Sequence, residues 1–196
     1  MRDDIQFLDG RRRFLRGAGA VAALSLLASG PLAELVAPAA AAAEAAIPLR
    51  LVNVNTNEAY DVELFTGGQW NPNALVVCDY LMRDWRQKAS TTCDRKIYAS
   101  LYVMQRYFAP TERIRIHSGY RTDATNRLLR EMGYNPAVNS QHLKAKAVDF
   151  SIAGADLRSV AKAVKALQLG GTGLYLDDGF VHLDTRGAAA QWGDSF

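Results

Sequence analysis

The sequence is poor in cysteine, in unbalanced charge and in long hydrophobic runs. Only two of its 196 residues are cysteines, Cys78 and Cys93, which are too few for a disulfide scaffold and too far apart for a CxxC motif. The net charge of +3 is spread without a basic block, so the sequence gives no reason to expect a nucleic-acid partner. The composition, 49% hydrophobic and 22% charged, fits one globular domain and excludes collagen-like, coiled-coil and wholly disordered chains.

Residues 1–43 carry the pattern of an export signal. Residues 11–15 place two arginines, any residue, Phe and Leu in order, and the apolar, Ala-rich run 17–29 follows. This order is typical of a twin-arginine signal peptide. The small residues that come next offer several A-x-A cleavage positions, so we expect the signal to end at position 41, 42 or 43. The mature protein would then be a single domain of residues 44–196.

The export pattern has two alternatives. An inner-membrane anchor is weaker, because the run is shorter than the roughly 20 apolar residues that a spanning helix requires and Gly30-Pro31 interrupts it. An Arg-rich amphipathic N-terminus without a targeting role is the other. Because the twin-arginine translocase exports folded proteins, the signal predicts a periplasmic location and no stable membrane span after processing.

Residues 44–196 predict an α+β fold, with a mainly antiparallel sheet flanked by helices. Short runs bounded by turn residues predict strands at 49–54, 59–65, 113–117, 146–152, 171–176 and 180–184. Apolar residues at helical spacing predict helices from Pro72 to about Lys88 and at 94–107, 123–132 and 156–169. The last two strands would form a hairpin around Asp177-Asp178-Gly179, since Asp-Gly suits tight turns.

The two cysteines admit opposite readings. An oxidising compartment favours a disulfide. A helix that reached Lys88 would leave Cys78 on the order of 15 Å from the loop that carries Cys93. A disulfide requires Cα atoms within about 7 Å, so this distance favours two separate buried thiols.

Histidine is also scarce, and two of the three histidines stand near carboxylates on apolar strands. Alternation along 146–152 sends the aliphatic and aromatic side chains to one face and Asp149 to the other. Alternation along 180–184 places His182 and Asp184 on one face, and His142 can fold back over that surface. Two imidazoles and one carboxylate leave one position of a tetrahedral zinc ion open to water, as in catalytic sites.

The spacing around His142 resembles a known family. The stretch Ser140-x-His142-x-x-Ala145-x-Ala147-x-Asp149 is similar to the SxHxxGxAxD motif of the zinc D-alanyl-D-alanine peptidases and their lysostaphin- and hedgehog-type relatives. Two further blocks of that family, and a feature typical of its murein endopeptidase branch, also have counterparts. These are residues 118–122 with Asn126, residues 180–184, and Asp84-Trp85-Arg86.

The resemblance implies a hedgehog/D-Ala-D-Ala-peptidase-like fold and a set of roles for the matched residues. It implies that zinc is the cofactor and that His142, Asp149 and His182 bind it. It also implies that Arg121 holds a substrate carboxylate or the developing oxyanion, for which its fixed charge and planar donors are suited. The substrate-binding positions expected from the matched blocks are Arg121, Ser118, Tyr120 and Ser140.

Two positions depart from the family pattern. Relatives place a Glu or His just before the last ligand, where this chain has Gly179-Phe180-Val181, so we assign the general base to Asp184 on the same strand face. Ala145 stands where the family has Gly, which would cost about 1 kcal/mol if the loop requires a left-handed conformation. His117 adjoins a matched block, and we favour a structural or supporting role for it over a third-imidazole role.

Each candidate also has a purely structural alternative. His142 could be an exposed loop histidine, Asp149 a turn or salt-bridge acid and His182 a hydrogen-bonded strand residue. Arg121 could pair with Asp123 or Glu131 on the surface. The three ligands in ordered blocks make the joint structural alternative weaker than each one alone.

The pattern therefore predicts a periplasmic zinc metallopeptidase that hydrolyses peptide cross-links of peptidoglycan, with the stem peptides as its partners. The endopeptidase assignment rests on the family resemblance. One alternative is a D-alanyl-D-alanine carboxypeptidase or dipeptidase. Another is a wall-binding module that keeps zinc without turnover, and a third is an envelope protein without metal.

Overall fold

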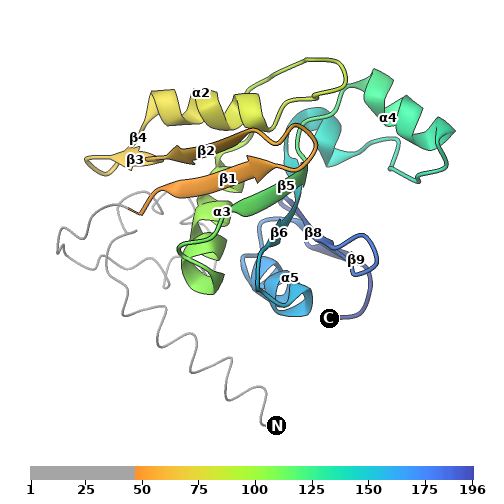
Figure 1. Cartoon of the computed structure of the whole chain (residues 1–196). Coiled ribbons are helices and arrows are strands. Elements are labelled where there is room, and N and C mark those ends of the chain that lie inside the picture. The colour runs from red at the N-terminus through yellow and green to blue at the C-terminus, as the bar shows by residue number, and fades with distance from the viewer. Residues whose placement is uncertain (1–46) are drawn as a thin grey trace, which may run out of the picture.

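The computed structural model describes residues 47–196, so the predicted signal peptide lies outside the described residues (Figure 1). The large sheet contains β1 (Leu49–Asn53), β2 (Ala59–Val62), β5 (Ile114–Ser118), β6 (Ala147–Ile152), β7 (Gly171–Tyr175), β8 (Phe180–Asp184) and β9 (Ala190–Gly193). A small ribbon contains β3 (Phe65–Thr66) and β4 (Gln69–Trp70). The helical elements are α2 (Pro72–Leu81), α3 (Arg95–Phe108), α4 (Asp123–Glu131), the 3-10 turn η2 (Gln141–Lys144) and α5 (Leu157–Ala166).

The strand order of the large sheet is β2-β1-β5-β6-β8-β7-β9. Its pairings are antiparallel except for β1 with β5 and β7 with β9, which are parallel. The predicted α+β class with a mainly antiparallel sheet is therefore confirmed. The register that matters most for the site places Asp149 of β6 opposite His182 of β8 at the middle of the sheet.

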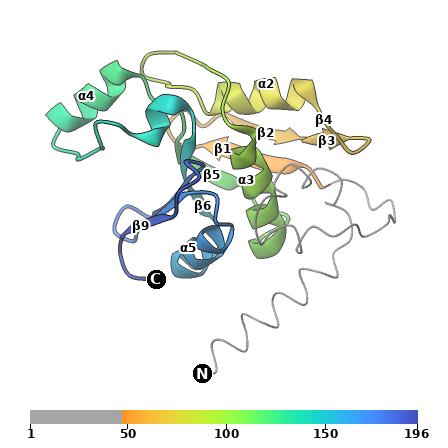
Figure 2. The same ribbon diagram turned by 180° about the vertical axis from the view of Figure 1, so that it is seen from behind.

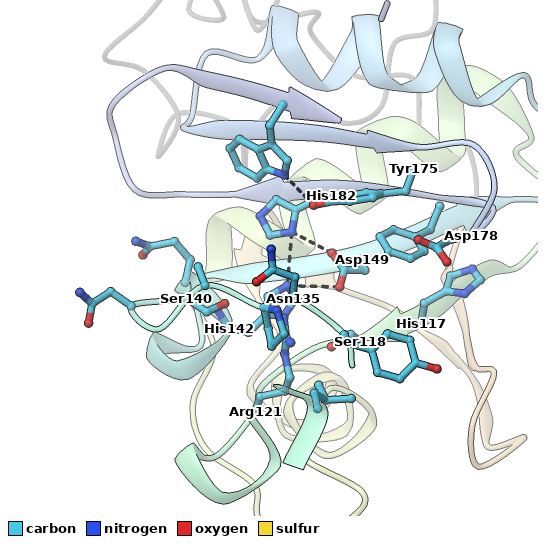
Figure 3. A pocket seen from close by; sticks show the side chains of 18 of the residues that line it. His117, Ser118, Arg121, Asn135, Ser140, His142, Asp149, Tyr175, Asp178 and His182 are labelled. Carbon is cyan, nitrogen blue, oxygen red and sulfur yellow. Dashed lines mark hydrogen bonds and ion pairs between the residues drawn. The ribbon is translucent and has the colours of Figure 1, made fainter. Parts of the chain in front are cut away.

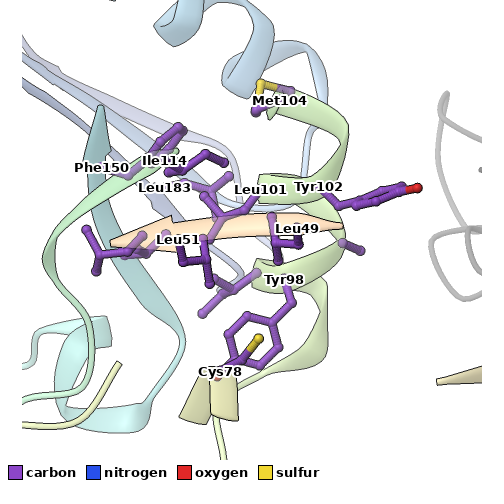
Figure 4. Packing of buried hydrophobic residues seen from close by; sticks show 14 of the residues in the cluster. Leu49, Leu51, Cys78, Tyr98, Leu101, Tyr102, Met104, Ile114, Phe150 and Leu183 are labelled. Carbon is purple, nitrogen blue, oxygen red and sulfur yellow. The ribbon is translucent and has the colours of Figure 1, made fainter. Parts of the chain in front are cut away.

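The core lies on the face of the sheet that α3 and α5 cover. Aspartates cap both helices, since Asp94 accepts a hydrogen bond from the Lys96 backbone and Asp156 accepts one from the Ser159 backbone. Alternate residues of β6 and β8 point into this core, as the sequence periodicity predicts. Figure 4 shows Leu49 and Leu51 of β1 beside side chains of α3, and in Figures 1 and 2 α4 and α5 lie on opposite sides of the sheet.

Two short elements were not expected from the sequence, and one predicted helix is too long. The sequence did not indicate β9 or the β3–β4 ribbon, and the strand expected to reach Phe65 ends at Val62. The helix expected to reach about Lys88 ends at Leu81. Beyond it, Asp84 Oδ1 accepts hydrogen bonds from the backbone of Arg86 and Gln87 at 3.1 and 3.2 Å. Side-chain bonds of this kind replace helical ones and end the helix.

Both cysteines are buried and carry free thiols, as favoured above. Burial raises the pKa of the Cys78 thiol and of the Cys93 thiol to about 12 in each case. Asp79 lies beside them, and its Oδ1 accepts hydrogen bonds from the Cys93 backbone at 2.9 Å and from the Tyr98 hydroxyl at 2.6 Å. Within residues 47–196, every helix is too short or too polar to cross a membrane.

Candidate metal centre

Two imidazoles and one carboxylate converge on the polar face of the sheet (Figure 3). His142 comes from η2, Asp149 from β6 and His182 from β8. His182 Nδ1 lies 2.8 Å from Asp149 Oδ1, and His142 Nε2 lies 3.3 Å from both Asp149 Oδ2 and His182 Nδ1. The structure thus brings together the three residues expected to bind metal, and all three are buried.

The outward nitrogen of each ring is fixed by an acceptor. His142 Nδ1 lies 2.6 Å from the carbonyl oxygen of Gly119, which can only accept a hydrogen bond. His182 Nε2 lies 3.2 Å from Asp184 Oδ2. In neutral rings each outward nitrogen therefore carries the proton, which leaves His142 Nε2 and His182 Nδ1 with lone pairs that face each other and Asp149. Such an arrangement matches the supporting bonds that orient metal-binding histidines.

The charges of the cluster suit a cation at its centre. Burial acts to raise the pKa of Asp149, but the two imidazoles outweigh burial, so the pKa lies below its usual range and the carboxylate stays ionised. Burial lowers the pKa of His142, which favours the neutral ring. Burial acts to lower the pKa of His182, but its contacts with Asp149 and Asp184 outweigh burial and raise it, so a proton on His182 Nδ1 can hold the 2.8 Å contact with Asp149 Oδ1. A metal ion bound between the three ligand atoms, which lie within 4.8 Å of one another, takes the place of that proton. The donor set therefore fits zinc, which takes imidazole and carboxylate ligands.

Asp184 lies on the far side of the His182 ring from Asp149. Its side chain is fully buried, and it accepts hydrogen bonds from the Gly171 backbone at 2.9 Å and from the Arg186 guanidinium. Burial acts to raise the pKa of Asp184, but His182 and Arg186 outweigh it, so the pKa lies below its ordinary value. A carboxylate with these partners is poorly placed to take a proton from water at the cluster. The geometry favours a positioning role over the expected role as general base.

A short turn places His142 over the sheet. Ser140 caps the turn, because its hydroxyl accepts a hydrogen bond from the His142 backbone at 3.3 Å. Ala145 ends the turn with φ 53° and ψ 35°, a left-handed conformation. The family glycine at this position is therefore explained, and this chain carries the cost of an alanine there, about 1 kcal/mol.

A cavity of about 650 Å³ opens beside the cluster. Arg121, Ser118 and Ser140 line it together with the three expected ligands, so these expected substrate-binding residues are brought together. Tyr120 is different, because its side chain packs against the hydrophobic core and does not line the cavity. Residues 134–137 of the loop after α4 also line the cavity.

Arg121 is a half-buried cation that forms no ion pair with an acidic side chain within residues 47–196. Its Nε atom is buried and has no hydrogen-bond partner among the described residues. Burial lowers the pKa of its guanidinium, and the nearby Asp149 opposes that effect. The adjacent Thr122 donates its backbone N–H and its hydroxyl to Asp84 Oδ2 at 2.9 and 2.8 Å, which fixes the segment. The surface pairing with Asp123 or Glu131 considered above is absent from the ion pairs of the described residues. The guanidinium is thus free to bind an anionic group.

His117 lies at the cavity wall and not in the cluster. Its Nε2 is 2.8 Å from the Ser151 hydroxyl, and its ring packs on Phe180 with centroids 5.6 Å apart. Burial lowers its pKa, so the neutral ring is favoured. These contacts suit the supporting role expected for it.

Two aromatic residues, Tyr175 and Trp192, form a further part of the cavity wall. Trp192 Nε1 donates a hydrogen bond to Tyr175 Oη at 2.8 Å, and both residues line the cavity. Their proximity depends on the parallel pairing of β7 with β9, which the sequence did not reveal. The available signal was the Gly171-x-Gly173 pattern, because alternate glycines on one strand face leave space for a large side chain.

Fold and site together define a class, namely α+β proteins whose antiparallel sheet carries a candidate metal centre of two imidazoles and one carboxylate. Comparison with known families identifies a particular one. The profile of the family described as "Peptidoglycan L,D-endopeptidase MepK" matches residues 41–192, and the chain belongs to this family. The resemblance seen in the motifs is thereby confirmed.

Curated relatives agree with the family. The chain is 32% identical over 188 residues to "Peptidoglycan L,D-endopeptidase MepK" of Escherichia coli strain K12, covering 94% of this chain and 98% of the relative. It is also 32% identical over 183 residues to "Probable peptidoglycan L,D-endopeptidase MepK" of Haemophilus influenzae, covering 93% of this chain and 95% of the relative. The comparison with solved structures gave no match.

Proposed function

We propose that this protein is a periplasmic zinc-dependent endopeptidase that hydrolyses L,D-peptide cross-links of peptidoglycan. The observation that carries the proposal is the cluster of His142, Asp149 and His182, whose outward nitrogens are already fixed by acceptors. Family membership and the names of the curated relatives support the substrate class. The open cavity beside the cluster provides room for a stem peptide.

In this proposal His142, Asp149 and His182 hold the ion. Zinc supplies Lewis-acid polarisation of a carbonyl group and activation of water near neutral pH. Gly119 and Asp184 keep both imidazoles in the tautomer that binds metal. Ser118, Ser140 and the loop at 134–137 shape the walls along which the peptide lies.

Arg121 binds the substrate. Its buried guanidinium, unpaired among the described residues, holds a carboxylate of the stem peptide and fixes the position of the scissile bond. Stem peptides carry such groups. A planar donor fork is better suited to this task than an ammonium group, because it can make two parallel hydrogen bonds to one carboxylate.

The test is digestion of purified dimeric muropeptides, with products resolved by mass. The purified wild-type protein is incubated with the dimers in the presence of zinc or of a chelator. The His142→Ala variant is incubated with zinc. Lys162→Ala serves as the control, because Lys162 is exposed on α5, across the sheet from the cluster. We expect monomeric products with zinc and with the control variant, and background levels with the chelator and with His142→Ala.

The same assay, run in parallel on uncross-linked muropeptides and with bound zinc measured, separates the alternatives. Loss of only a terminal residue from uncross-linked stems would assign a carboxypeptidase or dipeptidase. Bound zinc without cleavage of any muropeptide would assign a wall-binding module. Cleavage that survives complete removal of metal would contradict the zinc mechanism.

The periplasmic location rests on the twin-arginine pattern of residues 11–15 and needs its own test. We expect the double substitution Arg11→Lys and Arg12→Lys to retain the protein in the cytoplasmic fraction. The double substitution Arg13→Lys and Arg16→Lys is the control, because it changes the same charge type outside the arginine pair. Equal export of both variants would contradict the proposed route.

A further inference from the structure

Tyr175 stands at the end of β7 with its hydroxyl directed towards the candidate metal centre. In Figure 3 its ring extends from β7 towards His182. The charges of Asp149 and Arg121 both act on the Tyr175 phenol, which places it in the electrostatic field of the centre. The ring is half-buried and is supported by Phe180, with centroids 4.8 Å apart. Tyr175 is thus a fixed side chain with a polar tip at the cavity.

Trp192 determines how the hydroxyl is oriented. Its Nε1–H donates to Tyr175 Oη at 2.8 Å. An indole N–H can donate but cannot accept, so the phenol must be the acceptor in this bond. Among the described residues this is the hydroxyl's one hydrogen-bonding partner. The O–H proton of Tyr175 is therefore left to donate to a group in the cavity.

Two glycines of β7 leave space for the Trp192 indole. A Cβ atom at Gly173 would lie 2.5 Å from Trp192 Nε1, and one at Gly171 would lie 2.6 Å from Trp192 Cζ3. Both distances are too short for a real side chain, so the two glycines keep open the space that the indole fills. The indole also packs against the His182 ring, with centroids 5.1 Å apart, and beneath the Arg186 guanidinium. One side chain thus contacts both a candidate metal ligand and the Tyr175 hydroxyl.

We propose that Tyr175 is a catalytic residue whose hydroxyl donates a hydrogen bond to the scissile carbonyl oxygen as that oxygen becomes an oxyanion, and that Trp192 is its positioning residue. This inference rests on the proposed function. As water attacks the carbonyl carbon, a C–O bond forms and the carbonyl π electrons move onto the oxygen. The phenol proton stays on Oη and stabilises that charge. A phenol with an ordinary pKa of about 10 keeps this proton at neutral pH.

The role predicts an effect on kcat more than on KM. A donor aimed at the developing oxyanion acts in the transition state and contributes little to ground-state binding. Removal of one such donor reduces kcat about 10²- to 10³-fold. A tyrosine that only packs against its neighbours would tolerate loss of its hydroxyl, because the ring is unchanged.

The experiment is a double-mutant cycle on the zinc-loaded protein with dimeric muropeptide as substrate. Tyr175→Phe removes the hydroxyl alone, and Trp192→Phe removes the indole N–H. Tyr60→Phe is the control, because this half-exposed tyrosine lies on β2, at the opposite edge of the sheet from β9. Zinc content and melting temperature are measured for each variant, and so is inhibition by a phosphinate analogue of the cross-link.

We expect Tyr175→Phe to lose about 100-fold or more in kcat with KM within about threefold of wild type and with full zinc content. Inhibition by the phosphinate should weaken in parallel with kcat. Trp192→Phe should reduce kcat about tenfold in the wild-type background and have little effect in the Tyr175→Phe background, because it acts through that hydroxyl.

The outcomes distinguish the two proposals. If wild type with zinc cleaves no dimer, the proposed function fails. If wild type cleaves and Tyr175→Phe retains kcat within about threefold, the role of Tyr175 is overturned while the function stands. If the effects of the two substitutions multiply independently, Trp192 does not act through Tyr175. A Tyr175→Phe variant that loses zinc or melts early would assign the hydroxyl to structure and also overturn the proposal.

Discussion

Asp184 Oδ2 lies 3.2 Å from His182 Nε2, on the opposite side of the ring from Asp149. A carboxylate in this position raises the basicity of a metal-binding histidine and holds the ring in place. We predict that Asp184→Asn lowers zinc affinity about 10- to 100-fold, while saturating zinc restores kcat to within about threefold of wild type. Zinc titration against a competing chelator, followed by assay at saturating zinc, measures both quantities.

The same variant tests the role expected from the sequence. If Asp184 were the general base, its loss would reduce kcat about 10²- to 10⁴-fold at every zinc concentration. Asp177→Asn is the matched control, because it removes an exposed carboxylate from the β7–β8 turn. Normal zinc affinity with an unrecoverable loss of kcat would reinstate Asp184 as the base.

Arg121 provides the second prediction. Its buried guanidinium has no acidic partner at hydrogen-bond distance in the described part of the chain, so substrate is the group that it can bind. A charge-assisted hydrogen bond contributes about 1.5–3 kcal/mol, and we therefore expect Arg121→Ala to reduce kcat/KM about 10- to 100-fold. Arg121→Lys should recover only part of the loss, because an ammonium lacks the planar fork.

Steady-state assays on dimeric muropeptides measure this effect. Arg127→Ala is the control, since Arg127 is exposed on α4 and does not line the cavity. Unchanged kcat/KM in Arg121→Ala would remove Arg121 from the binding site.

Substitution of Gly173 tests how tightly the Trp192 indole packs against β7 in the folded protein. An alanine Cβ at this position would lie 2.5 Å from Trp192 Nε1 and 3.0 Å from Tyr175 Cε2. We predict that Gly173→Ala destabilises the protein by about 1–3 kcal/mol and shifts the indole fluorescence, because the ring must move. Gly154→Ala is a poor control because its φ is 76°, so the comparison is with Lys162→Ala, whose side chain is exposed on α5. Unchanged fluorescence and stability would contradict the tight packing.

The cysteines provide a prediction on pH. Burial raises the pKa of both thiols to about 12, so the reactive thiolate is scarce at neutral pH. In the native protein we expect iodoacetamide to leave both cysteines unmodified at pH 7.5, with a rate that rises about tenfold per pH unit towards 12 while the fold persists. Mass spectrometry after denaturation should show both sites alkylated. Rapid native labelling, or a mass that indicates a disulfide, would contradict the prediction.

Local patterns predicted the faces of the strands but not their partners. Alternation in β6 and β8 placed Asp149 and His182 on polar faces, because each residue of a strand points opposite to the next. The register that sets these two residues opposite each other is a long-range property. The family glycine raised the question of a left-handed φ at position 145 without answering it, and the alanine itself does not favour the conformation that the structure shows.

Tertiary contacts explain what the sequence did not reveal. β9 is four residues long and forms by pairing with β7, so its own composition gives no clear strand signal. The contact between Tyr175 and Trp192 depends on this pairing. The end of α2 was missed because it depends on contacts of Asp84 that are distant in sequence. Asp84 accepts hydrogen bonds from the backbone of Arg86, close in sequence, and of Thr122, far along the chain.

The outer position of β9 in the sheet has a consequence for the order in which the site comes apart. β9 pairs with β7 on one edge, whereas β6 and β8, which carry Asp149 and His182, are paired on both edges. Edge segments open at lower free energy than central strands, so hydrogen exchange should reach β9 before β6 and β8. Fraying at this one strand would release Trp192 while the proposed metal ligands remain assembled. In the proposed enzyme, catalytic competence would then fade at temperatures where the ion is still held.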